Sequence, residues 1–159
     1  MELPSDLIDL WAAFGDEHVE ALLVGGQALA LHGVPRFTND ADIWLRESPS
    51  NIKRALAALE TFGAPQQTMA GLVSARNLDV VWMGHPPSRI DLMVNVPGGS
   101  FDLAWASRVA FFINGVKVEC VNRDVLISLK RASGRPQDLL DCEMLSAHKP
   151  LGQANPPAR

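Results

Sequence analysis

The chain has 159 residues, of which 47% are hydrophobic and 20% charged, and its formal net charge is −4. These values are ordinary for a globular protein and exclude global disorder and a fibrous repeat. No apolar run approaches the roughly 18 residues that a membrane span needs, and the two cysteines are too few for a disulfide framework. The first residues carry acidic rather than basic side chains, unlike a secretory signal. We therefore expect a cytoplasmic protein with one domain over residues 1–148 and a flexible tail over 149–159.

The acidic balance argues against a surface that binds nucleic acid by phosphate neutralisation alone. The charges are nevertheless distributed unevenly. Residues 1–20 contain six acidic and no basic side chains, whereas residues 108–135 contain six basic and two acidic ones. Such an asymmetry ordinarily reflects solvated faces of opposite sign. It gains significance if the basic segment faces an acidic site.

The first third of the chain predicts five elements. They are a helix over 5–15, a strand over 21–24, a short helix over 27–33, a strand over 42–45 and a helix from Pro49 to Gly63. Ser5 is expected to cap the first helix, and the apolar face of that helix comprises Leu7, Leu10, Trp11 and Phe14. Gly25 and Gly26 are expected to form a tight turn at the end of the first strand.

The middle of the chain is less regular. Residues 64–78 show no clean period, and we expect a strand or an irregular segment there. Strands are predicted over 79–84, 89–94, 110–113 and 116–121, with one or two helical turns over 101–108. Asn114-Gly115 joins the last two strands and is the strongest hairpin signal in the sequence.

Two helices complete the prediction. Asn122 is expected to cap a helix that ends at Gly134, and Pro136 opens the last helix. The order of elements indicates an α+β fold, with a mixed, mostly antiparallel sheet that is flanked by helices and carries acidic residues at one edge. Three tryptophans are expected in the core, namely Trp44, Trp82 and Trp105.

Two carboxylates mark the start of the strand over 42–45. Asp40 and Asp42 are two residues apart, so their side chains point to the same face of a strand. Two carboxylates that lie so close repel each other and raise one pKa, unless a cation lies between them. A divalent metal removes the conflict, because Mg²⁺ typically binds one or two carboxylates together with substrate phosphate oxygens.

Asp91 is the third acidic residue of interest. It lies in the predicted strand over 89–94. On a strand adjacent to that of Asp40 and Asp42, it would complete a three-carboxylate site able to hold two metals for phosphoryl displacement. Gly25 and Gly26 precede a short helix, where backbone N–H groups without side chains can approach a phosphate.

These residues form a pattern of Gly-Gly, 13 intervening residues and Asp-x-Asp, followed by a later Asp on another strand. The pattern resembles the nucleotidyltransferase superfamily, with its DNA polymerase β-like fold. Within it, the chain is similar to small stand-alone bacterial nucleotidyltransferase-like proteins akin to the abortive-infection (type IV) toxins. The matching segments are residues 24–45, 86–93 and 129–141.

The resemblance implies metal-dependent transfer of a nucleoside monophosphate from an NTP, such as ATP, to a hydroxyl, with pyrophosphate as the leaving group. The acceptor it implies is an RNA or tRNA end, a protein or a small molecule, and the cofactor is Mg²⁺ or Mn²⁺. An antitoxin and a second copy of the chain are the partners to consider. No membrane partner is expected.

The resemblance also assigns roles by position. The catalytic residues and metal ligands would be Asp40, Asp42 and Asp91. Gly25 and Gly26 would bind the triphosphate, and many members of the superfamily have Ser where this chain has Gly26. In the carboxy-terminal block, Lys130 and Arg135 would contact phosphate and offset the charge on the leaving pyrophosphate.

Arg36 and Thr38 precede the acidic pair and are further candidates for substrate contact. A structural salt bridge from Arg36 to Asp40 or Asp42 explains that residue equally well.

Each assignment has a structural alternative. The glycines can form an ordinary turn, the three aspartates can be solvated strand residues, and Lys130 and Arg135 can be solvated helix charges. Asp138 is expected to be a helix amino-terminal charge, Asp141 a partner of Lys130 or Arg135, and His32 a packed histidine. His85 could contact the acceptor. The alternative function is a catalytically silent module of the same fold that binds a nucleotide or a partner.

Overall fold

The computed structural model describes residues 3–35, 40–85 and 88–147. The helices in these ranges are α1 (Ser5–Asp16), α2 (Gly25–Leu31), α3 (Pro49–Phe62), α4 (Gln66–Ser74), α5 (Phe101–Ala106), α6 (Arg123–Ser133) and α7 (Pro136–Ala147). The strands are β1 (Ala21–Val24), β2 (Ala41–Leu45), β3 (Val80–Met83), β4 (Ile90–Met93), β5 (Val109–Ile113) and β6 (Val116–Cys120). Among the described residues, no helix is both long and apolar enough to cross a bilayer.

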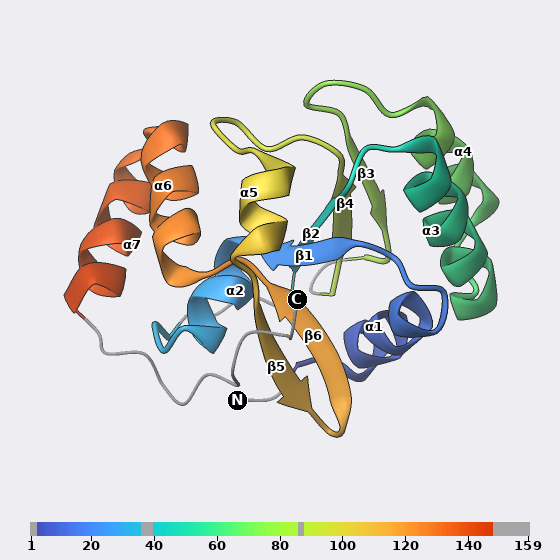
Figure 1. Ribbon diagram of the computed structural model, residues 1–159, viewed down its shortest axis with the longest axis horizontal. Helices are drawn as coiled ribbons and strands as arrows, with labels where there is room; N and C mark the ends of the chain where they lie inside the picture. Colours follow the sequence, from blue (N-terminus) through green and yellow to red (C-terminus); the bar gives the residue numbers. More distant parts are fainter. Residues whose placement is uncertain (1–2, 36–39, 86–87, 148–159) are drawn as a thin grey trace.

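The six strands form one sheet in the order β3-β4-β2-β1-β6-β5. The pairs β1–β2, β3–β4 and β5–β6 are antiparallel, whereas β1–β6 and β2–β4 are parallel. The predicted mixed, mostly antiparallel sheet is therefore confirmed. Figure 1 shows α1, α3 and α4 grouped at one end of the molecule, α6 and α7 at the other, and α5 near the middle.

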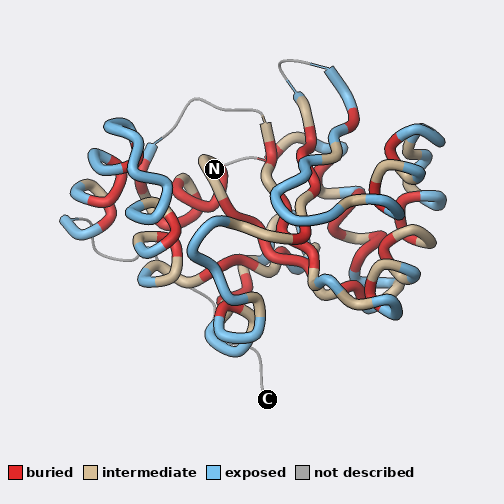
Figure 2. The backbone as a smooth tube through the Cα atoms, turned by 90° about the horizontal axis from the view of Figure 1, so that it is seen from above, coloured by how far each residue is buried: buried red, intermediate tan, exposed pale blue. Residues whose placement is uncertain are grey.

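The core follows the central strands. β1 lies between β2 and β6 in the sheet and is buried at all four of its positions. Figure 2 shows the same distribution, with buried residues concentrated in the middle of the molecule and the helices at both ends exposing one side. β2 is also an interior strand, and Asp42 is its least buried residue.

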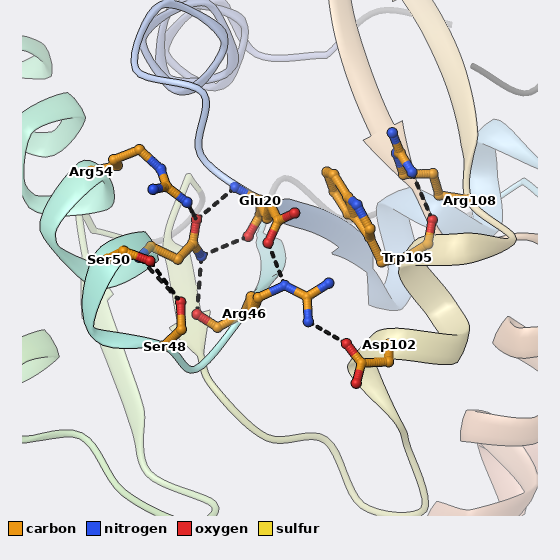
Figure 3. A network of polar contacts seen from close by, with 9 residues as sticks. Glu20, Arg46, Ser48, Ser50, Arg54, Asp102, Trp105 and Arg108 are labelled. Atoms are coloured by element: carbon orange, nitrogen blue, oxygen red, sulfur yellow. Dashed lines mark hydrogen bonds and ion pairs between the residues drawn. The ribbon is translucent and has the colours of Figure 1, made fainter. Parts of the chain in front are cut away.

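A polar network fixes the ends of β1 and β2 that lie away from the acidic residues (Figure 3). The fully buried Asn51 accepts a hydrogen bond from the Glu20 N–H at 2.8 Å and donates to the carbonyls of Glu20 and Arg46, both at 3.0 Å. Arg46 also pairs with the carboxylates of Glu20 and Asp102. The start of β1, the end of β2, α3 and α5 are thereby tied together.

The predicted helix caps, helix ends and hairpin turn are largely confirmed. Ser48 and Asn122 cap α3 and α6 through their side chains, and Gly63 and Gly134 end these helices in the left-handed conformation. The hairpin turn at Asn114-Gly115 has φ values of 51° and 77°. Such positive values at both turn residues match the right-handed twist of the flanking strands.

Four local predictions were wrong. Ser5 is the first residue of α1 rather than its cap, because the carbonyl of Pro4 accepts the first helical hydrogen bonds. The Gly25-Gly26 pair starts α2 instead of forming a separate turn. Residues 66–74 are helical, and this helix, α4, buries only two residues, too few to produce a period. Trp82 is 60% exposed because β3 is an edge strand.

Candidate active site

The acidic residues gather where β2 and β4 begin, next to the end of β1. The strands β2 and β4 run parallel, so both of their amino-terminal ends lie at the same end of the sheet. β1 runs antiparallel to β2 and delivers Gly25 to that end. The acidic group thus lies at one end of the interior strands rather than along an edge strand.

Asp42 and Asp91 are direct cross-strand neighbours in the register of β2 and β4. Side chains in register on adjacent strands lie on the same face, with Cβ atoms about 4.5–5.5 Å apart. Asp91 is buried, with 8% of its surface exposed, and Asp42 is partly buried. The structure therefore brings these two predicted site residues together.

Gly25 lies against the carboxylate of Asp42. Its φ is +72°, and a Cβ atom built on it would lie 2.1 Å from Asp42 Oδ2. Any side chain at this position would occupy the space of the carboxylate. The need for glycine at position 25 is therefore steric, and it does not rest only on the ability of glycine to form a turn.

The ionisation of Asp42 is strongly perturbed. Burial, reinforced by the negative charge of Asp91, raises the pKa of Asp42 to about 6, although the positive charge of Lys130 opposes the shift. Loss of solvation is the larger of the two causes, and repulsion from Asp91 adds to it.

Arg89 is the main site residue that the sequence analysis missed. Its Nη2 atom donates a hydrogen bond to Asp91 Oδ2 at 3.0 Å, and its Nε atom lies within ion-pair distance of Asp91 Oδ1, at 2.9 Å. Its backbone N–H donates to Asp40 Oδ1 at 3.1 Å, and its carbonyl accepts from the Ala41 N–H at 2.9 Å. The i, i+2 spacing of Arg89 and Asp91 on a strand is the signal that could have identified it.

Lys130 forms ion pairs with two aspartates of α7. Its Nζ atom lies 3.4 Å from Asp138 Oδ1 and 3.3 Å from Asp141 Oδ2, and its side chain is 12% exposed. The predicted pairing of Asp141 with Lys130 is confirmed. Lys130 is therefore not a solvated helix charge.

Arg135 is placed differently. Its side chain is 76% exposed and pairs with Asp138 at 2.7 Å. Burial favours a higher pKa for Asp138, but hydrogen bonds from Ser133 and Arg135, with the charge of Lys130, lower that pKa below its ordinary value. Asp138 lies in the first turn of α7, as expected, and it also forms ion pairs with Lys130 and Arg135.

The remaining candidates divide into three cases. Arg36 and Thr38 lie outside the described residues. His32 is buried, and its Nε2 atom lies 2.8 Å from the carbonyl oxygen of Val121, so its packing role is confirmed. His85 is exposed in the segment after β3. Gly26 is the second residue of α2 and is partly buried.

The carboxylates offer the hard oxygen atoms that Mg²⁺ prefers. A cation at Asp42 would offset the burial of its charge and the repulsion from Asp91, which together raise the pKa of Asp42. Within the described ranges, however, no three His, Cys, Asp or Glu side chains are grouped so as to hold a metal. The chemistry thus fits a single divalent ion at Asp42 and Asp91, and the three-carboxylate centre stays a prediction.

Comparisons with known proteins identify the fold. No family model and no curated protein matches the chain. Among solved structures, the lincosamide antibiotic adenylyltransferase LnuA, bound to lincomycin, superposes with a TM-score of 0.56 at 15% identity, over 92% of this chain and 99% of that one. ANT(2")-Ia in complex with adenylyl-2"-tobramycin gives 0.56 at 15% identity, over 89% and 86%.

An antigenic nucleotidyltransferase-like protein from Paracoccidioides brasiliensis gives a TM-score of 0.55 at 18% identity, over 90% of this chain and 77% of that one. The fold is therefore the nucleotidyltransferase fold, as the sequence predicted. At these identities the likeness establishes the architecture alone.

Proposed function

We propose that this protein is a metal-dependent nucleotidyltransferase that moves a nucleoside monophosphate from an NTP to a hydroxyl group. One observation carries the proposal. Asp42 and Asp91 face each other on adjacent strands, and a glycine that admits no side chain lies against Asp42. This arrangement concentrates negative charge beside open backbone, as a site for a cation and a phosphate chain requires.

The chain's own residues have distinct tasks in this reaction. The backbone at Gly25 and Gly26 approaches the triphosphate, and Lys130 offsets the charge of the departing pyrophosphate. A bond forms between the acceptor oxygen and the α-phosphorus while the bond from that phosphorus to pyrophosphate breaks. The hydroxyl proton passes to Asp91. A divalent ion held by Asp42 and Asp91 would polarise the phosphate oxygens.

Three considerations favour a small hydroxylated molecule as the acceptor. One solved structure of the same fold is an antibiotic adenylyltransferase by name, and another is in complex with adenylyl-2"-tobramycin. The net charge of −4 also disfavours a long polyanion. Trp82 is the cross-strand neighbour of Asp91 and is exposed, so it offers a ring surface on the acceptor side.

Thermal unfolding with each of the four NTPs, with and without Mg²⁺, tests the nucleotide site. Ligand at about 100 times its dissociation constant adds about 2.7 kcal/mol of stability, which is several degrees for a chain of this size. We expect a metal-dependent increase in the melting temperature that Asp42→Asn abolishes. No shift with any NTP would contradict the proposal.

Transfer of a radiolabelled nucleotide to tobramycin, lincomycin, tRNA or a protein extract then identifies the acceptor class. We expect labelled small molecules. Label in tRNA or protein, together with growth arrest on expression, would instead indicate a toxin-like enzyme and direct the search to an antitoxin.

The Arg89–Asp91 ion pair favours a second candidate, a nucleotide-binding module without turnover. Transfer requires Arg89 to leave Asp91, which its 41% side-chain exposure permits, whereas a silent module keeps the pair closed. Arg89→Gln distinguishes the two candidates. If the protein is an enzyme, Arg89→Gln should bind Mg²⁺ more tightly than the unmodified protein and should have a different transfer rate. If it is a silent module, the unmodified protein and Arg89→Gln should both bind NTP without forming product.

A further inference from the structure

The ion pairs between α6 and α7 are unusual for a helix contact. α7 turns four residues toward the interior, and they are Asp138, Asp141, Cys142 and Leu145. Asp138 and Asp141 are 3% and 1% exposed as side chains, yet both lie within ion-pair distance of the single ammonium of Lys130. Ser133 and Arg135 add hydrogen bonds to Asp138.

Stability alone does not account for this cluster. Burying charges costs desolvation free energy, and replacing a buried ion pair by apolar residues of similar size is often neutral or stabilising. Two apolar residues at 138 and 141 would extend the contact already made by Cys142 and Leu145. The cluster therefore calls for a role that needs a charged Lys130.

The placement of α6 indicates that role. Gly99 lies where the ring of Trp44 and the side chain of Leu129 meet, so a Cβ atom there would lie 2.7 Å from Trp44 and 3.0 Å from Leu129. Trp44 is two residues after Asp42 and on the same face of β2, and Leu129 precedes Lys130. α6 also contacts α2, the helix that Gly25 begins. Figure 1 shows α6 between α7 and α5.

We propose that Asp138 and Asp141 are positioning residues for nucleotidyl transfer, which hold the Lys130 ammonium at the acidic end of β2 to meet the triphosphate. This inference rests on the proposed function. Two carboxylates on successive turns of α7 restrict a long, flexible side chain to one region. A lysine fixed before binding loses less conformational entropy when it contacts phosphate.

The first test compares nucleotides that differ only in their phosphates. Calorimetry with Mg²⁺ measures the affinity for the α,β-methylene analogues of the four NTPs and for the matching monophosphates. Asp141→Asn and Asp138→Asn should reduce the preference for triphosphate over monophosphate about tenfold, the scale of one charged hydrogen bond, with monophosphate affinity unchanged. Lys130→Ala should abolish the preference, and Lys130→Arg should retain part of it.

The matched control is Glu119→Gln. Glu119 is a partly buried carboxylate shared by two cations, at 3.1 Å from Arg108 and 2.7 Å from Lys117, and it belongs to β6. This variant should leave the triphosphate preference unchanged.

A second measurement needs no nucleotide. Acetylation of lysines, followed by mass spectrometry, should label Lys130 more slowly than the exposed Lys53, and Asp141→Asn should accelerate labelling at Lys130 alone. Equal labelling of Lys130 and Lys53 in the unmodified protein would overturn the inference.

The outcomes separate the two proposals. If the unmodified protein binds triphosphates and the aspartate variants keep its phosphate preference, the positioning role is overturned and the proposed function stands. Equal loss of triphosphate and monophosphate affinity indicates a purely structural role and also overturns it. If the unmodified protein binds no triphosphate, the proposed function fails and the inference fails with it.

Discussion

A side chain at position 25 would occupy the same space as the carboxylate of Asp42. A residue with a side chain meets two penalties there, the left-handed φ of +72° and the 2.1 Å approach to Asp42 Oδ2. The first penalty is about 1 kcal/mol, and displacing a carboxylate that is partly buried adds to it. The position thus couples the start of α2 to the geometry of the acidic pair.

We predict that Gly25→Ala lowers the free energy of unfolding by about 2–4 kcal/mol and removes Mg·NTP binding. Urea denaturation and calorimetry measure the two effects. Gly115→Ala is the matched control, because Gly115 has a φ of +77° and a Cβ atom there would have no neighbour within 4 Å, so it tests the backbone penalty alone. In an Asp42→Ala background, the cost of Gly25→Ala should fall to that of Gly115→Ala. Simple additivity of the two substitutions would contradict the steric explanation.

Individual residues also show where sequence reasoning succeeds and fails. The proximity of Asp42, Asp91 and Gly25 could be predicted because each lies at or near the end of a predicted strand, whereas their roles stay predictions. Arg89 was missed because a basic residue two positions before an aspartate is common on strands, and only the register of β4 with β2 places it against the site. Trp82 was misplaced because its strand is apolar, and the sequence does not state that β3 lies at an edge.

Among the elements, α3 bonds the ends of β1 and β2 through a single buried amide. Asn51 satisfies one N–H and two carbonyl groups from the ends of β1 and β2. A buried backbone group that loses its partner costs about 1–3 kcal/mol. The strand ends opposite the acidic residues are therefore held by a side chain from a helix.

We predict that Asn51→Ala lowers the free energy of unfolding by at least about 2 kcal/mol, measured by thermal and urea unfolding. Asn95→Ala is the control, because Asn95 makes a solvent-exposed hydrogen bond to Glu47 and should change stability by less than about 0.5 kcal/mol. Hydrogen exchange should rise at β1 and at the end of β2 in Asn51→Ala. Equal effects of the two substitutions would show that the network does not hold the strands.

Elements with strong local signals were predicted correctly. The hairpin between β5 and β6, and the caps of α3 and α6, depend on one or two residues each, and these residues act within their own turn. α4 has no such signal. It follows Pro65 and is fixed by long-range contacts, because Thr68 bonds the Trp82 carbonyl and Gly71 packs against Val81.

At the scale of the whole molecule, two buried groups give stability opposite dependences on pH. Burial lowers the pKa of His32 below 6.5, so its contribution is complete above pH 6.5 and is lost as the pH falls. Burial and Asp91 raise the pKa of Asp42 from 3.8 to about 6, so its contribution is complete below pH 3.8 and is lost as the pH rises through 6. Without a metal, ionised Asp42 therefore destabilises the protein at neutral pH.

We predict that Asp42→Asn in chelator is more stable than the unmodified protein at pH 7.5, by up to about 3 kcal/mol, and that the difference vanishes near pH 4. The sign follows because the amide avoids the cost of a buried charge, which the carboxyl avoids only when protonated. His32→Gln serves as the opposite case: its deficit at pH 7.5 should shrink as the pH falls to 5, where the unfolded histidine takes up a proton. Urea denaturation of the three proteins at each pH measures these differences.

Saturating Mg²⁺ should remove the advantage of Asp42→Asn, because the cation neutralises the carboxylate in the unmodified protein only. An advantage that is independent of both pH and Mg²⁺ would mean that Asp42 is no part of a charged site.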